Sequence, residues 1–259
     1  MRNTSDLRFW RLIVVAVGLV LMSAGMAGAG ELDLTSLNSS GFINGAYFLQ
    51  ADPHSTGSGL IHSFVRMQAS PTEQGYNTDY RPVEFDEDKT GTFNHSLLWS
   101  VVPVVTIDNI DYREFLLDVN ETKPGSLISL DKLEIYLLST GDQHTYSAFG
   151  TPVYTLDPSG QNNWIKLDYA LNSGSGGGDM FAYIPNSLFT GTNQYVYLYS
   201  MFGETIPTSD GFEEWAWFER APIVPEPGSL LALSSGLAGL LGSCYRFSAR
   251  RKAGKTPLS

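Results

Sequence analysis

Cysteine is almost absent from this chain. The one cysteine, Cys244, lies in an apolar run near the C-terminus. The chain therefore cannot form an internal disulfide, and it has no zinc or redox site built from cysteines. The long segment between Gly30 and Pro222 must be stabilised by packing or by metal ions, and it is long enough to bury a core without disulfides.

Basic residues are scarce in the middle of the chain. The whole sequence has 27 acidic and 16 basic residues, which gives a net charge of −11. All of the acidic residues except Asp6 and Glu226 lie between Gly30 and Pro222, whereas half of the basic residues lie outside this segment. Such an acidic segment repels nucleic acid and anionic lipid, so we expect neither as a partner. Divalent cations and neutral or cationic partners remain compatible with it.

Two common catalytic signatures are missing. The four histidines, His54, His62, His95 and His144, form no HExxH motif, and no serine lies in a GxSxG motif. The glycine-rich stretch at 174–178 is not followed by Lys-Ser or Lys-Thr, which argues against phosphate binding. We therefore predict no catalytic residues and no enzymatic activity.

The N-terminus has the three parts of a secretory signal peptide. A basic region with three arginines comes first, an apolar stretch follows at 12–22, and the small residues at 27–29 provide a cleavage site. We predict that residues 1–29 are a signal peptide and that the chain is exported.

The C-terminal segment, 222–259, combines a proline motif, an apolar run and a basic end. Residues 228–245 contain no Asp, Glu, Lys or Arg, and they are near the minimum length for a transmembrane helix. The basic end at 246–259 should stay in the cytoplasm, which places the preceding chain outside. The motif is Val224, Pro225, Glu226 and Pro227, and the basic stop contains Arg246, Arg250, Arg251 and Lys252.

In this order, the Pro-Glu-Pro motif, the apolar run and the basic end resemble the PEP-CTERM sorting tail of Gram-negative bacteria that make extracellular polysaccharide. The resemblance implies that an exosortase in the inner membrane recognises Pro225, Glu226 and Pro227. It further implies a transient stay in the inner membrane and then a place at the cell surface or in an exopolysaccharide layer. Without a sorting enzyme, the same tail would be a permanent single-span anchor.

The segment between the two termini has the two-residue period of β-strands. Short runs rich in Val, Ile, Tyr, Trp and Phe alternate with Gly, Pro, Asn and Asp. Asp108-Asn109 is suited to a tight turn, and Pro103 predicts an edge or a bulge. We predict that residues 30–221 form one acidic all-β domain, a β-sandwich of the jelly-roll type. The predicted strands are 42–49, 60–68, 96–107, 112–119, 132–138, 153–156, 164–169, 180–184, 195–202 and 214–219.

Four segments of this region, at 113–118, 133–136, 195–200 and 211–215, also look like segments of other exported domains that carry this tail. No activity is assigned to that group, so the likeness supports the architecture and the location rather than a reaction.

Three tyrosines are the main candidates for a ligand platform. Tyr195, Tyr197 and Tyr199 share one face of a predicted strand, while Val196 and Leu198 share the other. If the aliphatic face turns to the core, the three rings form a flat outer surface suited to a polysaccharide. The alternative is that tyrosine simply suits a half-buried strand.

Carboxylates suggest a structural calcium ion at two places, because calcium prefers oxygen ligands in loops. Neither place has the EF-hand pattern, and a solvated acidic loop is the alternative for both, so we predict no metal ligand. The first candidate is Glu84, Asp86, Glu87 and Asp88 with Asp79 nearby, and the second is Asp168 and Asp179.

Glu213 and Glu214, beside Trp215 and Trp217, would suit a glycan hydrolase if both carboxylates entered one cleft. Adjacent residues of a strand point to opposite faces, so we expect core packing instead. The sequence therefore predicts a non-enzymatic, exported surface or matrix protein associated with exopolysaccharide. A carbohydrate-binding or adhesive module and a glycan-active hydrolase are the alternatives.

Overall fold

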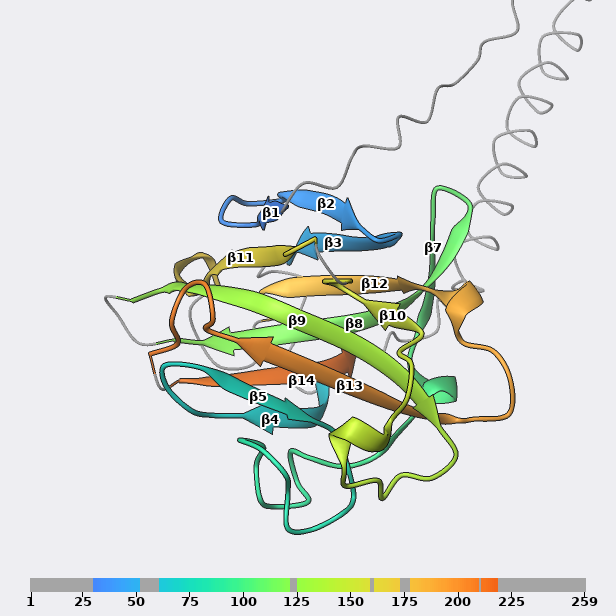
Figure 1. Cartoon of the computed structure of the whole chain (residues 1–259). Coiled ribbons are helices and arrows are strands. Elements are labelled where there is room, and N and C mark those ends of the chain that lie inside the picture. Colours follow the sequence, from blue (N-terminus) through green and yellow to red (C-terminus); the bar gives the residue numbers. More distant parts are fainter. Residues whose placement is uncertain are drawn as a thin grey trace, which may run out of the picture.

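The computed structural model describes residues 30–51, 61–121, 125–158, 161–172, 178–209 and 211–218. These residues form two β-sheets that pack face to face, with short 3-10 helices in the connections (Figure 1). The predicted all-β sandwich is confirmed. The predicted signal peptide, the motif at 224–227, the apolar run at 228–245 and the basic stop all lie outside the described residues.

Sheet A contains β1 (Glu31–Asp33), β5 (Glu73–Tyr76), β6 (Leu97–Leu98), β9 (Leu127–Leu138), β10 (Tyr154–Thr155), β11 (Trp164–Asp168) and β13 (Tyr195–Phe202). Its order is β1-β11-β9-β13-β5, with β10 paired to β9 and β6 paired to β13. The pairing of β1 with β11 is parallel, and the other pairs in this sheet are antiparallel. The long strands β9 and β13 form its centre.

Sheet B contains β2 (Ser40–Ile43), β3 (Ala46–Gln50), β4 (Ile61–Met67), β7 (Val104–Ile107), β8 (Ile110–Asn120), β12 (Met180–Pro185) and β14 (Phe212–Phe218). Its order is β2-β3-β12-β8-β14-β4, with β7 paired to β8, and its pairs are antiparallel. β14 lies between β8 and β4, and this central position explains why it has apolar residues on both faces.

Two hairpins of sheet B close through two-residue turns. Asp108 and Asn109 join β7 to β8 with φ angles of 49° and 64°, which confirms the predicted turn. Asn44 and Gly45 join β2 to β3 in the same way, with φ angles of 50° and 83°. Positive φ at both central residues is what such a turn requires, and Asn-Gly adopts it readily. The prediction of one strand over 42–49 is therefore wrong, because this turn divides it.

The predicted strand over 96–107 is also divided. It comprises β6, a 3-10 helix at Trp99–Val101 and β7, and Pro103 lies between the helix and β7. Two strands of sheet A, β1 and β5, were not predicted because both are short and each contains acidic residues.

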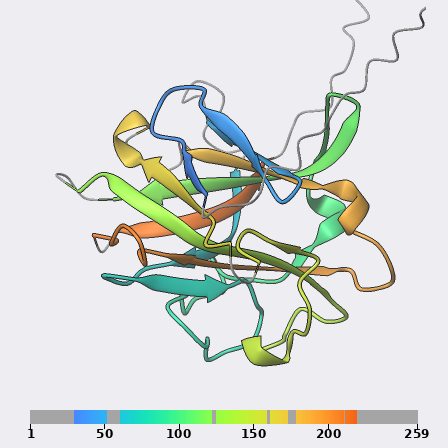
Figure 2. The same cartoon turned by 45° about the horizontal axis from the view of Figure 1, so that its top comes forward.

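The main core lies between the two sheets. Val196 and Leu198 of β13 point into it from sheet A, and Trp215 of β14 points into it from sheet B. The Trp215 indole nitrogen donates a hydrogen bond to the Ser200 hydroxyl at 3.0 Å, so a polar contact joins the two sheets across the core. Figure 2 shows the two layers from a second direction.

Candidate functional site

The three tyrosines predicted to form a platform do lie on the outer face of β13, opposite Val196 and Leu198. However, Tyr197 and Tyr199 are only 0% and 3% exposed, and Tyr195 is half-buried. The expected outward row of rings is therefore not present, because a further layer of side chains covers it.

This layer is an aromatic cluster on one half of the outer face of sheet A. The Tyr146 ring stacks on Tyr199 with 4.2 Å between ring centroids. The Tyr197 hydroxyl donates to the Thr140 carbonyl and accepts from the Gln143 amide, and burial raises the pKa of this phenol to about 12. The other members of the cluster are Tyr76, Phe85, Tyr136 and Phe149.

The other half of that outer face is shaped by a β-bulge in β9. Leu130 and Leu133 both point into the core although they are three positions apart. Simple alternation would put them on opposite faces. The pairing with β13 skips Asp131 between Leu130 and Lys132, which resolves the conflict. Bulges re-aim side chains, and here two consecutive residues, Asp131 and Lys132, reach the same outer surface.

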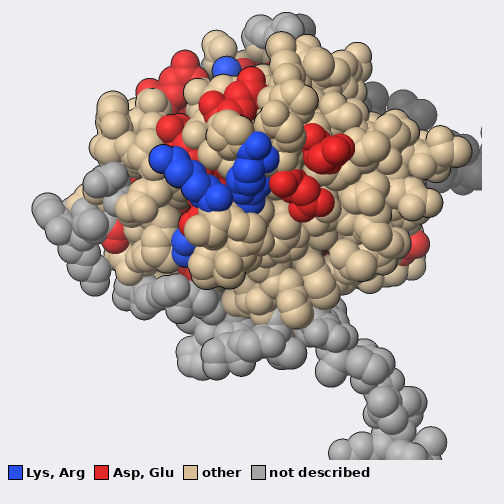
Figure 3. Space-filling model, turned by 90° about the horizontal axis from the view of Figure 1, so that it is seen from below, with Lys and Arg blue, Asp and Glu red and all other residues tan. Residues whose placement is uncertain are grey.

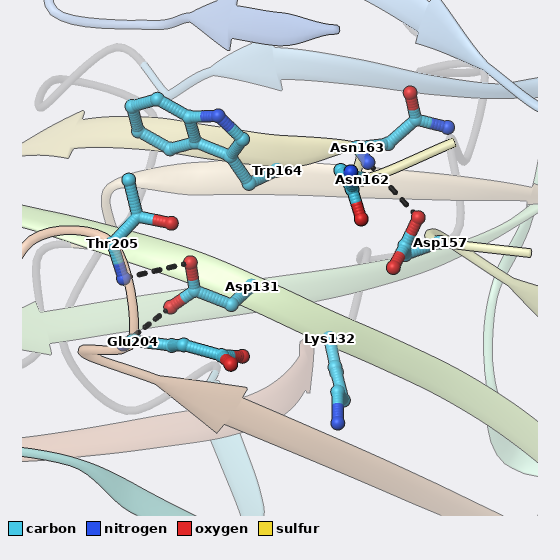
Figure 4. A pocket seen from close by; sticks show the side chains of 8 residues that line it. All are labelled: Asp131, Lys132, Asp157, Asn162, Asn163, Trp164, Glu204 and Thr205. Atoms are coloured by element: carbon cyan, nitrogen blue, oxygen red, sulfur yellow. Dashed lines mark hydrogen bonds between the residues drawn. The ribbon is translucent and has the colours of Figure 1, made fainter. Parts of the chain in front are cut away.

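An open pocket of about 480 Å³ lies over this bulge (Figure 4). Lys132 forms one side of the pocket, and Trp164 of β11 lies on the opposite side in this view. The connection before β11 contributes Asp157, and the connection between β13 and β14 contributes Glu204 and Thr205. Three parts of the chain that are far apart in sequence therefore meet here.

Asp131 holds the loop that forms one wall of the pocket. One carboxylate oxygen accepts from the Glu204 amide at 2.8 Å and from the Ser129 hydroxyl at 2.7 Å. The other accepts from the Thr205 amide at 3.1 Å. Asp131 is only 6% exposed, so its charge is used to fix the loop and is not available to a ligand.

A second carboxylate organises the opposite wall. Asp157 accepts from the Asn163 amide at 3.0 Å. The Asn163 side chain then donates to the Leu156 carbonyl and to the Gln161 side chain. Its neighbour Asn162 has a φ of 52° and an exposed side chain, so its amide group is free to project from the turn.

The pocket therefore combines one aromatic ring with several hydrogen-bonding groups. Trp164 alternates with Ile165 and Leu167, which point into the core, so its ring lies on the outer face and is half-buried. Lys132 supplies a cation, and Glu204 supplies an exposed carboxylate. A ring beside amides and charged groups suits a ligand that has both an apolar face and hydroxyl groups.

The acidic residues proposed as calcium ligands have protein partners instead. The Tyr76 hydroxyl donates to Glu84 at 2.7 Å, the Arg66 guanidinium donates to Asp88 at 2.6 Å, and Glu87 accepts two backbone amides. Asp86, Asp79, Asp168 and Asp179 each accept a backbone amide as well. In the described part of the chain, no group of three or more His, Cys, Asp or Glu side chains is placed to hold a metal ion. Figure 3 shows a face on which several basic side chains lie beside acidic ones.

Glu213 and Glu214 do not share a cleft. Glu213 is fully buried on the inner face with Trp215, whereas Glu214 accepts a hydrogen bond from the Ser63 hydroxyl on the other face. The expectation that this strand packs in the core is confirmed. Trp217 packs against the core and stacks on His62 at 4.2 Å between ring centroids.

The sequence did not single out Trp164, Asp131 or Glu204. Only the outward position of Trp164 could have been found, from its alternation with two aliphatic residues. The bulge at Asp131 and the loop around Glu204 depend on pairing between distant strands.

No protein-family model, curated protein or solved structure matches this chain. Within the residues that the structure describes, no helix has the length and apolar character needed to cross a membrane. The predicted span at 228–245 is outside that part.

Proposed function

We propose that this chain is an exported surface or matrix protein whose jelly-roll-like sandwich binds a neutral polysaccharide, without cleaving it, in the pocket beside Trp164. The observation that carries this proposal is the half-buried Trp164 ring, which lies at an open pocket with amide and carboxylate groups around it. Sugars present an apolar face to an aromatic ring and hydroxyl groups to polar side chains, so they match both features.

The charge of the pocket favours a neutral saccharide. Asp157 and Glu204 contribute negative charge, and Lys132 is the basic residue among the pocket's lining. The protein as a whole is strongly acidic as well. A polysaccharide rich in uronic acid or sulfate would meet repulsion, whereas a neutral chain would not.

The proposal of binding without cleavage rests on how the carboxylates are used. A glycan hydrolase needs one carboxyl group as an acid and another as a base or nucleophile. Both oxygens of Asp131 accept hydrogen bonds from the wall of the pocket, and Asp157 accepts one from Asn163. These roles are structural, so the pocket is better suited to holding a saccharide than to hydrolysing it.

Export and sorting form the second half of the proposal, and they rest on sequence. The predicted signal peptide at 1–29 and the tail at 222–259 suit delivery through the inner membrane and processing by an exosortase at Pro225–Pro227. A saccharide-binding domain delivered in this way would reach the cell surface or the exopolysaccharide layer, where its ligand is found.

The test is binding of the protein to an array of neutral and acidic oligosaccharides, followed by titration calorimetry with the best ligand. Trp164→Ala should weaken binding at least about tenfold, which corresponds to about 1.4 kcal/mol. Tyr80→Ala is the matched control, because Tyr80 is an exposed aromatic residue outside the pocket, and it should leave the affinity unchanged.

Equal binding by the wild type and Trp164→Ala would refute this site, and a preference for acidic chains would refute the ligand class. Release of reducing ends from the ligand, measured in the same samples, would refute binding without cleavage.

A further inference from the structure

Two glutamates from opposite sheets meet inside the sandwich. Glu73 of β5 pairs with Phe202 of β13, whose ring is in the main core, so the Glu73 side chain also points inward. Glu213 of β14 shares the inner face with Trp215. The two side chains are 1% and 0% exposed, and they lie close enough for a hydrogen bond between their carboxyl groups.

The hydrogen-bond partners of this pair are incomplete. One oxygen of Glu73 accepts from the Ala69 amide at 3.0 Å. Among the described residues, the other Glu73 oxygen and both Glu213 oxygens accept no hydrogen bond of good geometry, and the Asn120 backbone amide is a nearby donor that partly offsets the rise in the pKa of Glu213. Two ionised carboxylates offer only acceptors to each other and repel, whereas one proton between them creates a hydrogen bond and removes a buried charge.

The surroundings of the pair are also acidic. Glu121, directly after β8, and Asp86, after β5, are the charged groups that act on Glu73, and both disfavour its ionisation. Arg66 of the neighbouring strand β4 is engaged by Asp88 instead. Burial raises the pKa of Glu73 to about 7, and burial together with Glu73 raises the pKa of Glu213 well above its usual range.

We propose that Glu73 and Glu213 hold one proton between them and so form a proton-operated latch that joins sheet A to sheet B. Loss of the proton leaves two buried negative charges facing each other, and the latch opens. Because the folded protein binds this proton more tightly than the unfolded chain does, the pair contributes most stability below the ordinary glutamate pKa of 4.5. This stability is lost as the pH rises from there toward the raised pKa values of the pair.

The latch adjoins one end of the loop that lines the saccharide pocket, because Glu213 follows this loop and Glu73 accepts from the amide of Ala69, whose carbonyl accepts from the Thr208 hydroxyl. This loop, between β13 and β14, is held at Glu121, which accepts from the Ser209 amide at 2.8 Å, and at Pro71, whose carbonyl accepts from the Thr208 amide at 2.9 Å. The same loop carries Glu204. Opening of the latch therefore loosens a wall of the pocket, but the latch itself does not depend on whether that pocket binds saccharide.

The experiment is urea unfolding of the full-length protein with EDTA between about pH 5 and pH 8, followed by tryptophan fluorescence. For the wild type, we expect the unfolding equilibrium constant to increase by up to about tenfold for each pH unit, as one bound proton requires. Glu213→Gln should flatten this dependence, because its amide donates to Glu73 at every pH. Glu73→Gln should also flatten the pH dependence of unfolding. It takes the place of Glu213→Gln in the experiment if that variant does not fold.

Glu214→Gln is the matched control, because Glu214 is the next residue on the same strand but faces the other way, and it should keep the wild-type pH dependence. Equal pH dependence in the wild type and both pair variants would overturn the latch. A repeat with calcium in place of EDTA distinguishes the ligand: if calcium abolishes the pH dependence of the wild type, the pair binds a cation rather than a proton, and the proposal is wrong.

Discussion

Replacing Asp131 by asparagine should destabilise the domain, because this side chain fixes the loop between β13 and β14. Asn has nearly the same shape, but one of its two terminal groups is an NH₂ that cannot accept a hydrogen bond. At least one of the bonds from the Glu204 and Thr205 amides is therefore lost, and the new NH₂ meets a backbone N–H. Hydrogen bonds to charged groups contribute about 1.5–3 kcal/mol, and an unsatisfied buried donor costs about 1–3 kcal/mol.

We therefore expect Asp131→Asn to lower the free energy of unfolding by about 2–4 kcal/mol, a large part of the ~5–15 kcal/mol of a typical domain. Urea unfolding at neutral pH measures this difference. Glu204→Gln is the control. The Glu204 side chain is exposed, so replacing its carboxylate by an amide should change the free energy of unfolding by less than about 0.5 kcal/mol. If Asp131→Asn loses no more stability than this control, the loop does not depend on the carboxylate.

Two further predictions concern the same loop and the ends of the chain. Gly203→Ala should destabilise the domain by about 2–4 kcal/mol in thermal or urea unfolding, because Gly203 has a φ of 87° and an added Cβ would lie 2.3 Å from the Pro71 carbonyl oxygen. A Gly203→Ala variant as stable as the wild type would contradict the close approach of the Pro71 carbonyl oxygen to Gly203. Mass spectrometry of the protein from cells and medium should find a mature chain that starts near Gly30 and ends near Pro227. Recovery of chains that still contain Arg250 in the inner-membrane fraction would exclude tail processing.

Strand positions were predictable from the sequence where the alternation of side chains is regular. For β13, the predicted and observed bounds agree, because aliphatic and tyrosine residues alternate from Tyr195 to Leu198. β5 was missed because its inward positions are Glu73 and Gly75, which have no apolar side chain to reveal the buried face. The turn at Asn44-Gly45 carried a recognisable signal, but the apolar residues on both sides suggested one continuous strand.

The ligand site was predicted less well than the strands. Which side chains of the outer face are covered depends on contacts between residues that are far apart in the sequence. Spacing correctly placed three tyrosines on one face of β13, but it could not reveal that Tyr146 and Phe149 return to cover them. In the same way, nothing near Trp164 in the sequence indicates that a bulge in β9 and the loop at 203–209 will surround it.

The pairing of β1 with β11 has a consequence for the folding kinetics of the domain. Glu31 pairs with Trp164, so the first described strand has no neighbour in its sheet until more than half of the chain has been made. The last described strand, β14, also joins distant partners, since Phe212 pairs with Asn120. Chains dominated by such non-local pairs fold slowly, because the entropy of closing long loops is lost before the stabilising contacts form. We expect refolding in roughly milliseconds to seconds, with β1 and β14, the first and last described strands, among the last to join their sheets.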